Sequence, residues 1–348
     1  MIICNLILIT SIVIIFYTTN WLIIWYLIEL NTIMIIILIN QNNPRSTEAT
    51  AKYFLIQALT SIIILTGIVL NYFTSGSLSI FNFYSPISYN LIIISLMIKI
   101  AIFPNPFWFI DVISGISISR NIYIVIFSKI TPVYIYFTLS PHNLSVTISI
   151  ISLLSIIYGS LLGINQLNTR KIIGLSSTAN LGWIIISFPL LPGNICLLLF
   201  LSYIFMLSPL LWGLYLSNIN LLIKSSNTYY NSINIYFIII SLLSLGGLPP
   251  LLGFFYKWLI FNSIIINNNF IISGVLLISS LLSLFFYLNL CFSFKGIYWP
   301  ELKILILLNL NNSNKSLVYL ISISIVLLNN LAIISISLIS PLSASWWI

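Results

Sequence analysis

The sequence predicts an all-α, polytopic membrane protein with about eleven transmembrane helices, and three observations lead to this fold class. The chain has 348 residues, of which 60% are hydrophobic and only 5% are charged, whereas a soluble domain carries about a quarter charged residues. Apolar stretches of about twenty residues recur, each long enough to cross roughly 30 Å of hydrocarbon. These stretches, such as residues 33–39, do not alternate apolar and polar positions as the strands of a membrane barrel do. A soluble enzyme is therefore excluded.

The predicted crossings follow one another along the whole chain. They cover residues 1–18, 21–40, 48–72, 87–118, 121–139, 144–163, 170–190, 194–217, 234–262, 270–292 and 317–340. Two crossings contain prolines that we expect to break the helix, because proline removes a hydrogen bond and its ring clashes with the preceding turn. Pro104 and Pro106 lie in the fourth crossing, and Pro249 and Pro250 lie in the ninth. No loop is long enough to fold alone, so residues 1–348 are expected to form a single transmembrane domain.

The charges of the loops predict the orientation of the chain. Every basic loop residue follows an even-numbered crossing, whereas the other loops carry neither lysine nor arginine. The basic loop residues are Arg45, Arg120, Arg170, Lys171, Lys224, Lys295, Lys303 and Lys315. Short loops that are rich in lysine and arginine stay on the cytoplasmic side of a membrane. The N-terminus is therefore expected on the cytoplasm-equivalent side, and the C-terminus on the opposite side.

Cysteine and histidine give no sign of a bound cofactor. Cys4, Cys196 and Cys291 lie far apart in or beside apolar segments, where a cysteine is most often a small buried hydrophobe. His142 is the only histidine in the sequence, so no cluster of ligands for zinc, haem or an iron–sulfur centre is predicted. There is no glycine-rich phosphate loop. We expect no redox or nucleotide chemistry within this chain.

Apart from the basic loop residues, four lysines lie within predicted helices, and one glutamate lies inside the second crossing. A charge near the bilayer centre costs roughly 2.5–3.5 kcal/mol. These residues are Glu29, Lys52, Lys99, Lys129 and Lys257. Lys52 lies close to the start of its helix, so it is equally compatible with a functional role and with a side chain that extends to the membrane surface. The other four lie deeper, and such groups normally face the bundle interior and mark routes for ions or protons.

A chain of lysines and one glutamate, bridged by hydroxyl and amide side chains and by water, could pass protons. Asp111 follows the fourth-crossing break and is expected to balance Arg120, so it receives no catalytic role. Two broken helices, each beside a deep lysine, are also the pattern of transporters built from inverted repeats. The near absence of acidic residues argues against a sodium site, because hard cations prefer carboxylate and carbonyl oxygens.

Four motifs, in order along the chain, resemble the subunit 2 family of mitochondrial NADH dehydrogenase. They are Thr47–Ala58; Lys99–Pro104 with Phe107-Trp108; Arg170–Ser177 with Leu181-Gly182-Trp183; and Ser244–Phe254 with Lys257-Trp258. The last ninety or so residues resemble this family only in hydropathy. Two family histidines are replaced here, by Pro106 and Asn180, so any role of those histidines does not carry over.

The resemblance implies an antiporter-like subunit of respiratory complex I in the mitochondrial inner membrane, with inverted repeats and its N-terminus in the matrix. It implies proton translocation coupled to electron transfer from NADH to ubiquinone. NADH, FMN, the iron–sulfur clusters and ubiquinone would bind partner subunits. The partners of this chain would be other membrane-arm subunits and membrane lipids, and no nucleic acid is expected to bind. Two alternatives remain open, namely a free-standing cation/proton antiporter subunit and a purely structural membrane spacer.

The same resemblance implies roles for the four deep residues. Glu29 and Lys99 would form a paired glutamate and lysine. Lys129 would be the central connecting lysine, and Lys257 would be the lysine of the second broken helix. These four residues are the predicted proton-transfer site.

Overall fold

A computed structural model describes residues 2–41, 43–80, 85–139, 146–166, 168–217, 232–249 and 251–296. Within these ranges the chain is almost entirely helical, and extended backbone pairs at an isolated bridge between Asn20 and Ser79. The described helices fall into two compact units. The first unit contains the described residues up to Gly159 together with Arg170–Gly193, and the second contains Ser160–Thr169 and the described residues from Asn194 onward.

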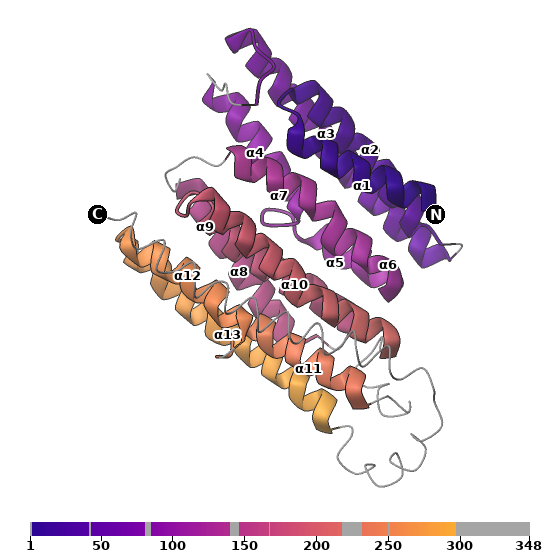
Figure 1. The fold of residues 1–348 in the computed structure, drawn as a ribbon, viewed down its shortest axis with the longest axis vertical. Coiled ribbons are helices and arrows are strands. Elements are labelled where there is room, and N and C mark those ends of the chain that lie inside the picture. The colour runs from indigo at the N-terminus through magenta and orange to yellow at the C-terminus, as the bar shows by residue number, and fades with distance from the viewer. Residues whose placement is uncertain are drawn as a thin grey trace. The chain divides into compact units, whose positions relative to one another are not determined.

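Helices α1 to α9 belong to the first unit, except for the end of α8 from Ser160 and the first residue of α9 (Figure 1). Their bounds are α1 (Ile2–Tyr17), α2 (Trp21–Ile39), α3 (Pro44–Ser75), α4 (Pro86–Ile100), α5 (Phe107–Gly115), α6 (Ile118–Ile122), the π-helix η1 (Tyr123–Phe127), α7 (Ser128–Leu139), α8 (Val146–Ile164) and α9 (Thr169–Ser187). Residues with suitable backbone preferences mark several ends. The Asn20 side chain accepts a hydrogen bond from the Leu22 N–H and caps α2, and Gly76 ends α3 with a φ of 67°.

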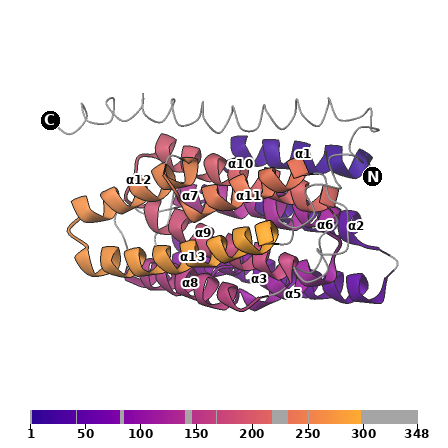
Figure 2. The same cartoon turned by 90° about the horizontal axis from the view of Figure 1, so that it is seen from below.

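The second unit contains α10 (Gly193–Ser217), α11 (Ser232–Gly246), α12 (Leu252–Ile266) and α13 (Phe270–Gly296). Helices α11 and α12 follow one another as two pieces of a broken helix, and α13 lies alongside both pieces (Figure 2). This arrangement brings the break between α11 and α12 next to the middle of a continuous helix.

The described helices lie along the residues of the first ten predicted crossings. Among the described residues, six helical stretches are each long and apolar enough to cross a membrane: Trp21–Ile39, Pro44–Ser75, Ile118–Leu139, Val146–Ile164, Gly193–Leu216 and Phe270–Phe294. The two predicted breaks are present, since the fourth crossing is divided into α4 and α5 and the ninth into α11 and α12. The eleventh crossing, residues 317–340, lies outside the described residues, so the total of eleven stays a prediction.

Many polar side chains of the first unit are buried, and many large apolar side chains are exposed. On α3, Gln57 and Thr60 are buried, whereas Leu55 and Leu59 are exposed. A helix that is apolar almost all round can place its few polar residues inside the bundle, because lipid cannot form hydrogen bonds with them. Helices α3 and α4 pack closely at Gly67, since a Cβ atom added there would lie 2.7 Å from a side-chain carbon of α4. The interior of this unit is therefore polar enough to hold ionisable groups.

Candidate functional site

The first helix break lies between α4 and α5 and satisfies its own backbone carbonyls. Ala101 takes a left-handed conformation with a φ of 68°, and its N–H donates to the Ile98 carbonyl at 3.1 Å. The Trp108 indole N–H donates to the same carbonyl at 3.2 Å. The carbonyls at a helix end need such partners when water is excluded. Trp108 therefore ties the start of α5 to the end of α4.

Lys99 lies in the last turn of α4, directly before this break, and is only 2% exposed. Its ammonium donates to the Gln57 backbone carbonyl of α3 at 3.4 Å. Glu29 of α2 interacts electrostatically with both Lys99 and Tyr53. No nitrogen–oxygen distance between Lys99 and Glu29 reaches 4.0 Å or less, so these two described residues form no direct ion pair. The structure places the predicted pair within electrostatic range but not in contact.

The Glu29 carboxyl group has free hydrogen-bonding capacity. Its Oε1 atom is buried and has no hydrogen-bond partner among the described residues. One turn earlier on the same face of α2, the Trp25 indole N–H donates to the Ser61 carbonyl at 3.2 Å and fixes α2 against α3. A buried carboxyl oxygen without a donor is costly. The Glu29 side chain can therefore accept a further hydrogen bond.

Lys129 lies near the start of α7 and is 1% exposed. Its Nζ atom donates to the Ser177 hydroxyl of α9 at 3.2 Å and lies 3.7 Å from the centroid of the Phe109 ring. The Ser177 hydroxyl itself donates to the Gly174 carbonyl at 2.7 Å, so its lone pairs are free to accept from the lysine. Lys129 forms no ion pair with any carboxylate in the described part of the chain. A hydroxyl group and an aromatic ring thus hold this ammonium group in place of a counter-charge.

A π-helical segment, Tyr123–Phe127, comes directly before α7. Pro132 lies inside α7, one turn after Lys129, and cannot donate a hydrogen bond to the preceding turn. Insertions of π-helix into α-helices occur often at functional sites, because they change the direction of the side chains that follow. Here the irregular segment precedes the turn that carries Lys129.

The second helix break lies between α11 and α12, and its glycines are required by close contacts. Gly247 has a φ of 82°, and a Cβ atom on it would lie 3.0 Å from the Lys257 side chain. At the start of α12, a Cβ atom on Gly253 would lie 1.5 Å from the Ser244 carbonyl oxygen. Only glycine allows α12 to approach the end of α11 so closely. The spacing of glycines in this motif therefore has a direct steric cause.

Lys257 interacts with this break. Its ammonium donates to the Gly246 carbonyl at 2.9 Å and to the Ser283 hydroxyl of α13 at 3.4 Å. Gly246 is the last residue of α11, and the C-terminal end of a helix carries a partial negative charge that favours a cation. The three predicted lysines thus share one feature: each contacts a backbone carbonyl or a hydroxyl group, and none contacts a carboxylate within the described residues.

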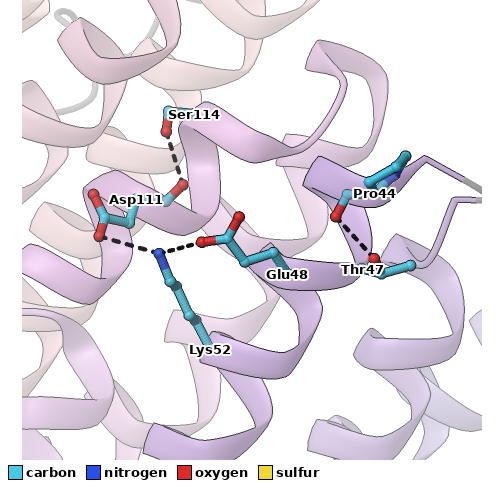
Figure 3. Close-up of polar contacts among 6 residues, drawn as sticks. All are labelled: Pro44, Thr47, Glu48, Lys52, Asp111 and Ser114. Carbon is cyan, nitrogen blue, oxygen red and sulfur yellow. Dashed lines mark hydrogen bonds and ion pairs between the residues drawn. The ribbon is translucent and has the colours of Figure 1, made fainter.

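Lys52 lies at the surface, with a side-chain exposure of 43%. Its Nζ atom lies 2.8 Å from Glu48 on its own helix and 3.8 Å from Asp111 on α5 (Figure 3). The expectation that Asp111 balances Arg120 is therefore wrong, because the packing of α5 against the start of α3 brings Asp111 to Lys52 instead. This exposed cluster supports the surface alternative for Lys52, and it joins α5 to α3.

Two arginines bind backbone carbonyls at the same end of the first unit. The Arg120 guanidinium donates to the Ile39 and Asn40 carbonyls at the end of α2. The Arg170 guanidinium donates to the Ser114 and Ile116 carbonyls at the end of α5, at 3.2 and 2.7 Å. Basic residues of different predicted loops are thus brought close to one another, as a shared membrane side requires. Lys224, Lys303, Lys315 and the side chain of Lys295 lie outside what the structure describes.

No group of three or more histidine, cysteine, aspartate or glutamate side chains comes together in the ranges given above. His142, the only histidine of the sequence, lies outside those ranges. The prediction that cofactors belong to partner subunits therefore remains a prediction.

Comparison with known proteins places the chain in a family. Residues 18–283 match the family model described as NADH:quinone oxidoreductase/Mrp antiporter, TM. The chain is 36% identical over 280 residues to NADH-ubiquinone oxidoreductase chain 2 of Scyliorhinus canicula, and the match covers 80% of each protein. This chain belongs to the NADH-ubiquinone oxidoreductase chain 2 family. It is a multi-pass membrane protein.

The fold of this chain is similar to that of chains in solved structures of other membrane complexes. A chain of respiratory complex I from Thermus thermophilus matches with a TM-score of 0.72 and 22% identity, covering 80% of this chain and 66% of that chain. A chain of the Mrp complex from Dietzia sp. DQ12-45-1b matches with a TM-score of 0.74 and 15% identity, covering 83% of this chain and 59% of that chain. This chain therefore spans about two thirds or less of the length of both solved chains.

Pro106 and Asn180, where the sequence resemblance led us to expect histidine, have clear places in the fold. Pro106 is the residue before α5, with a φ of −81°, and it begins that helix after the break. Asn180 is buried in α9, three residues after Ser177. Neither residue contains a group that titrates near neutral pH, so the proton-transfer roles of histidine are absent at both positions.

Sequence reasoning identified the lysines but missed their immediate neighbours. Ser177 and Phe109 contact Lys129, and the Gln57 carbonyl contacts Lys99. Ser177 lies within a motif that the resemblance had already singled out. Phe109 follows Phe107-Trp108 directly, but nothing in the local sequence indicates that its ring faces a lysine.

Proposed function

We propose that this chain is a core membrane subunit of a proton-translocating NADH:ubiquinone oxidoreductase in the mitochondrial inner membrane. It takes part in proton translocation that is coupled to electron transfer from NADH to ubiquinone, and the redox chemistry takes place in other subunits of the membrane complex. One observation carries the proposal. Lys129 is almost fully buried, and its contacts are a hydroxyl group and an aromatic ring, with no carboxylate ion pair among the described residues. Such an ammonium group can lose its proton without leaving an unpaired buried carboxylate behind.

The lysines supply sites that hold and release protons in this proposal. Lys99 and Glu29 are close enough to influence one another electrostatically, and they are not locked in a direct ion pair. A change of the electric field at this pair, driven by quinone reduction elsewhere, changes how strongly Lys99 holds its proton. Protons then shift to Lys129 and onward to Lys257 in the second unit.

The driving force has to come from a redox partner. Moving one charge across the membrane against 100 mV takes roughly 2.3 kcal/mol. Within the described residues, lysine contacts with carbonyl and hydroxyl groups supply binding sites but no comparable source of energy. Assembly with other membrane-arm subunits and with subunits that bind NADH, FMN, iron–sulfur clusters and ubiquinone is therefore part of the proposal.

Topology completes the proposal. The N-terminus faces the matrix, residues 1–348 form a single transmembrane domain, and the chain crosses the membrane eleven times with the repeats inverted. The arginines that bind the ends of α2 and α5 support a shared side for these loops.

The proposal is tested first by association and then by pumping. Immunocapture of this chain from mildly solubilised mitochondria, followed by a native gel stained for NADH dehydrogenase activity, should give co-migration with a large, active band. Lys99→Met and Lys129→Met should each leave the complex assembled and lower the protons pumped per NADH oxidised. Lys52→Met is the matched control, because the same substitution removes a lysine at the surface. Normal pumping in Lys129→Met would overturn the role of the buried lysines.

The rival function is a free-standing cation/proton antiporter subunit. The fold similarity to a chain of the Mrp complex is compatible with this function. Sodium-dependent exchange in membranes that lack NADH dehydrogenase would support it. A structural spacer is the third possibility, and full pumping by an assembled complex that carries Lys257→Met would support that one.

A further inference from the structure

Phe109 is the one aromatic ring that the structure places over a lysine ammonium group, among the residues described. It lies on α5, its side chain is completely buried, and the Lys129 Nζ atom lies 3.7 Å from the ring centroid. At this distance the negative face of the ring attracts a cation, and the attraction is strongest where water is excluded. The same face offers nothing comparable to a neutral amine.

One contact holds the Phe109 ring directly, and two further contacts hold helix α5, which carries it. Trp108 packs against Phe109 edge to face, with ring centroids 5.7 Å apart, and its indole N–H is fixed on the Ile98 carbonyl that the helix break leaves available. At the other side of α5, Asp111 pairs with Lys52 of α3. The end of α5 is bound by the Arg170 guanidinium through the Ser114 and Ile116 carbonyls. Helix α5 is therefore anchored at both ends, and its orientation determines where the ring points.

We propose that Phe109 is a positioning residue for Lys129, and that its ring favours the protonated form of this lysine and so sets the pH at which Lys129 exchanges protons. This inference rests on the proposed function, in which Lys129 carries a proton in transit. The ring takes no proton itself, because it has no acidic or basic atom. It acts by making the ammonium form more favourable than the neutral amine.

The other groups near Lys129 do not discriminate between its two forms in the same way. The Ser177 hydroxyl accepts a hydrogen bond from the lysine, and it can accept one from the ammonium group and from the neutral amine alike. None of the ionisable groups on the elements that pack against α7 forms a hydrogen bond or an ion pair with Lys129 in the described ranges. These groups are Cys4 and Tyr17 on α1, Tyr26 and Glu29 on α2, Tyr89 and Lys99 on α4, Asp111 on α5, Tyr123 on η1, and Arg170 and Lys171 on α9.

The test is the pH dependence of proton pumping by the assembled complex in liposomes. Phe109→Leu and Phe109→Met remove the ring, and methionine keeps much of the side-chain volume and flexibility needed to fill the site. With either variant, Lys129 should lose its proton roughly tenfold more readily, and the alkaline limb of the pumping profile should move about one pH unit toward lower pH. Phe109→Tyr keeps the ring and should keep the wild-type profile.

The matched control is Phe107→Leu on the same helix. Phe107 is 58% exposed and its ring contacts Tyr158, not a lysine. This variant should leave the pH profile in place. An unchanged profile in Phe109→Met, or an equal shift in Phe109→Met and Phe109→Tyr, would overturn the inference, since neither result depends on the presence of a ring face.

The Lys129→Met variant separates this inference from the proposed function. Normal pumping in Lys129→Met overturns the proposed function. Lowered pumping in Lys129→Met together with an unshifted profile in Phe109→Met overturns only the role of Phe109. In the Lys129→Met background, removing the ring should have no further effect on the pH profile of the residual pumping, because the two residues then no longer act on one another.

Discussion

Gly253→Ala adds only one methyl group, but it should disrupt the packing of the second helix break. The new Cβ atom would lie 1.5 Å from the Ser244 carbonyl oxygen, and both atoms belong to the backbone or are fixed to it. A carbon–oxygen contact needs about 3.3 Å, so α12 has to move away from α11 by roughly 1.8 Å. Overpacking of this kind costs typically 1–3 kcal/mol and sometimes more.

The same movement should disconnect Lys257. Its ammonium lies 2.9 Å from the Gly246 carbonyl, so a shift of roughly 1.8 Å takes the pair beyond hydrogen-bonding distance. A hydrogen bond to a charged group contributes about 1.5–3 kcal/mol. Together the two effects predict a loss of about 3 kcal/mol or more in the stability of the second unit.

The measurement compares Gly253→Ala with Gly274→Ala. A Cβ atom on Gly274, which lies within α13, would meet nothing within 4 Å, so this control should be neutral or stabilising by about 0.5–1 kcal/mol. The amount of assembled complex on a native gel, its thermal inactivation and its NADH-driven pumping are recorded for both variants. Equal stability and equal pumping in the two variants would refute the steric explanation of the glycine at position 253.

Three smaller predictions concern the first unit. Lys52→Met should leave both thermal stability and pumping nearly unchanged, because its ion pair with Asp111 is exposed and screened by water; a large loss of thermal stability would contradict this. Arg170→Leu should cost about 1–3 kcal/mol, because two carbonyls at the end of α5 lose their donor, whereas Lys171→Leu removes an equal charge without these bonds; thermal inactivation of the two variants decides it. Gly67→Ala should cost about 1–3 kcal/mol through overpacking of α3 on α4, and a heat-stable variant would count against that close contact.

Much of the fold could be predicted because its signals are local. Hydropathy located the described helices, and the prolines at 104, 106 and 249 indicated both breaks, since a proline removes a backbone hydrogen bond from a helix. The π-helical segment before α7 was missed. Pro132 was visible, but how the chain absorbs a proline depends on the helices that pack around it.

The site residues could be selected but not paired. A lysine deep in a long apolar stretch can be identified from the sequence, and such a lysine normally faces the interior of the helix bundle. Its contacts are not evident, and the expected partnership of Asp111 with Arg120 was wrong for this reason: the two residues are near in sequence, but helix packing turns Asp111 toward Lys52.

By itself, the sequence determined that this protein is a helical membrane protein, where its helices break, and which charges lie deep within them. These properties follow from single residues and their near neighbours. The tertiary structure alone decided that Phe109 and Ser177 hold Lys129, that a backbone carbonyl of Gln57 receives Lys99, and that Gly253 touches Ser244. Such contacts join residues from different helices, and the spacing of residues along one chain does not specify how two helices turn toward each other.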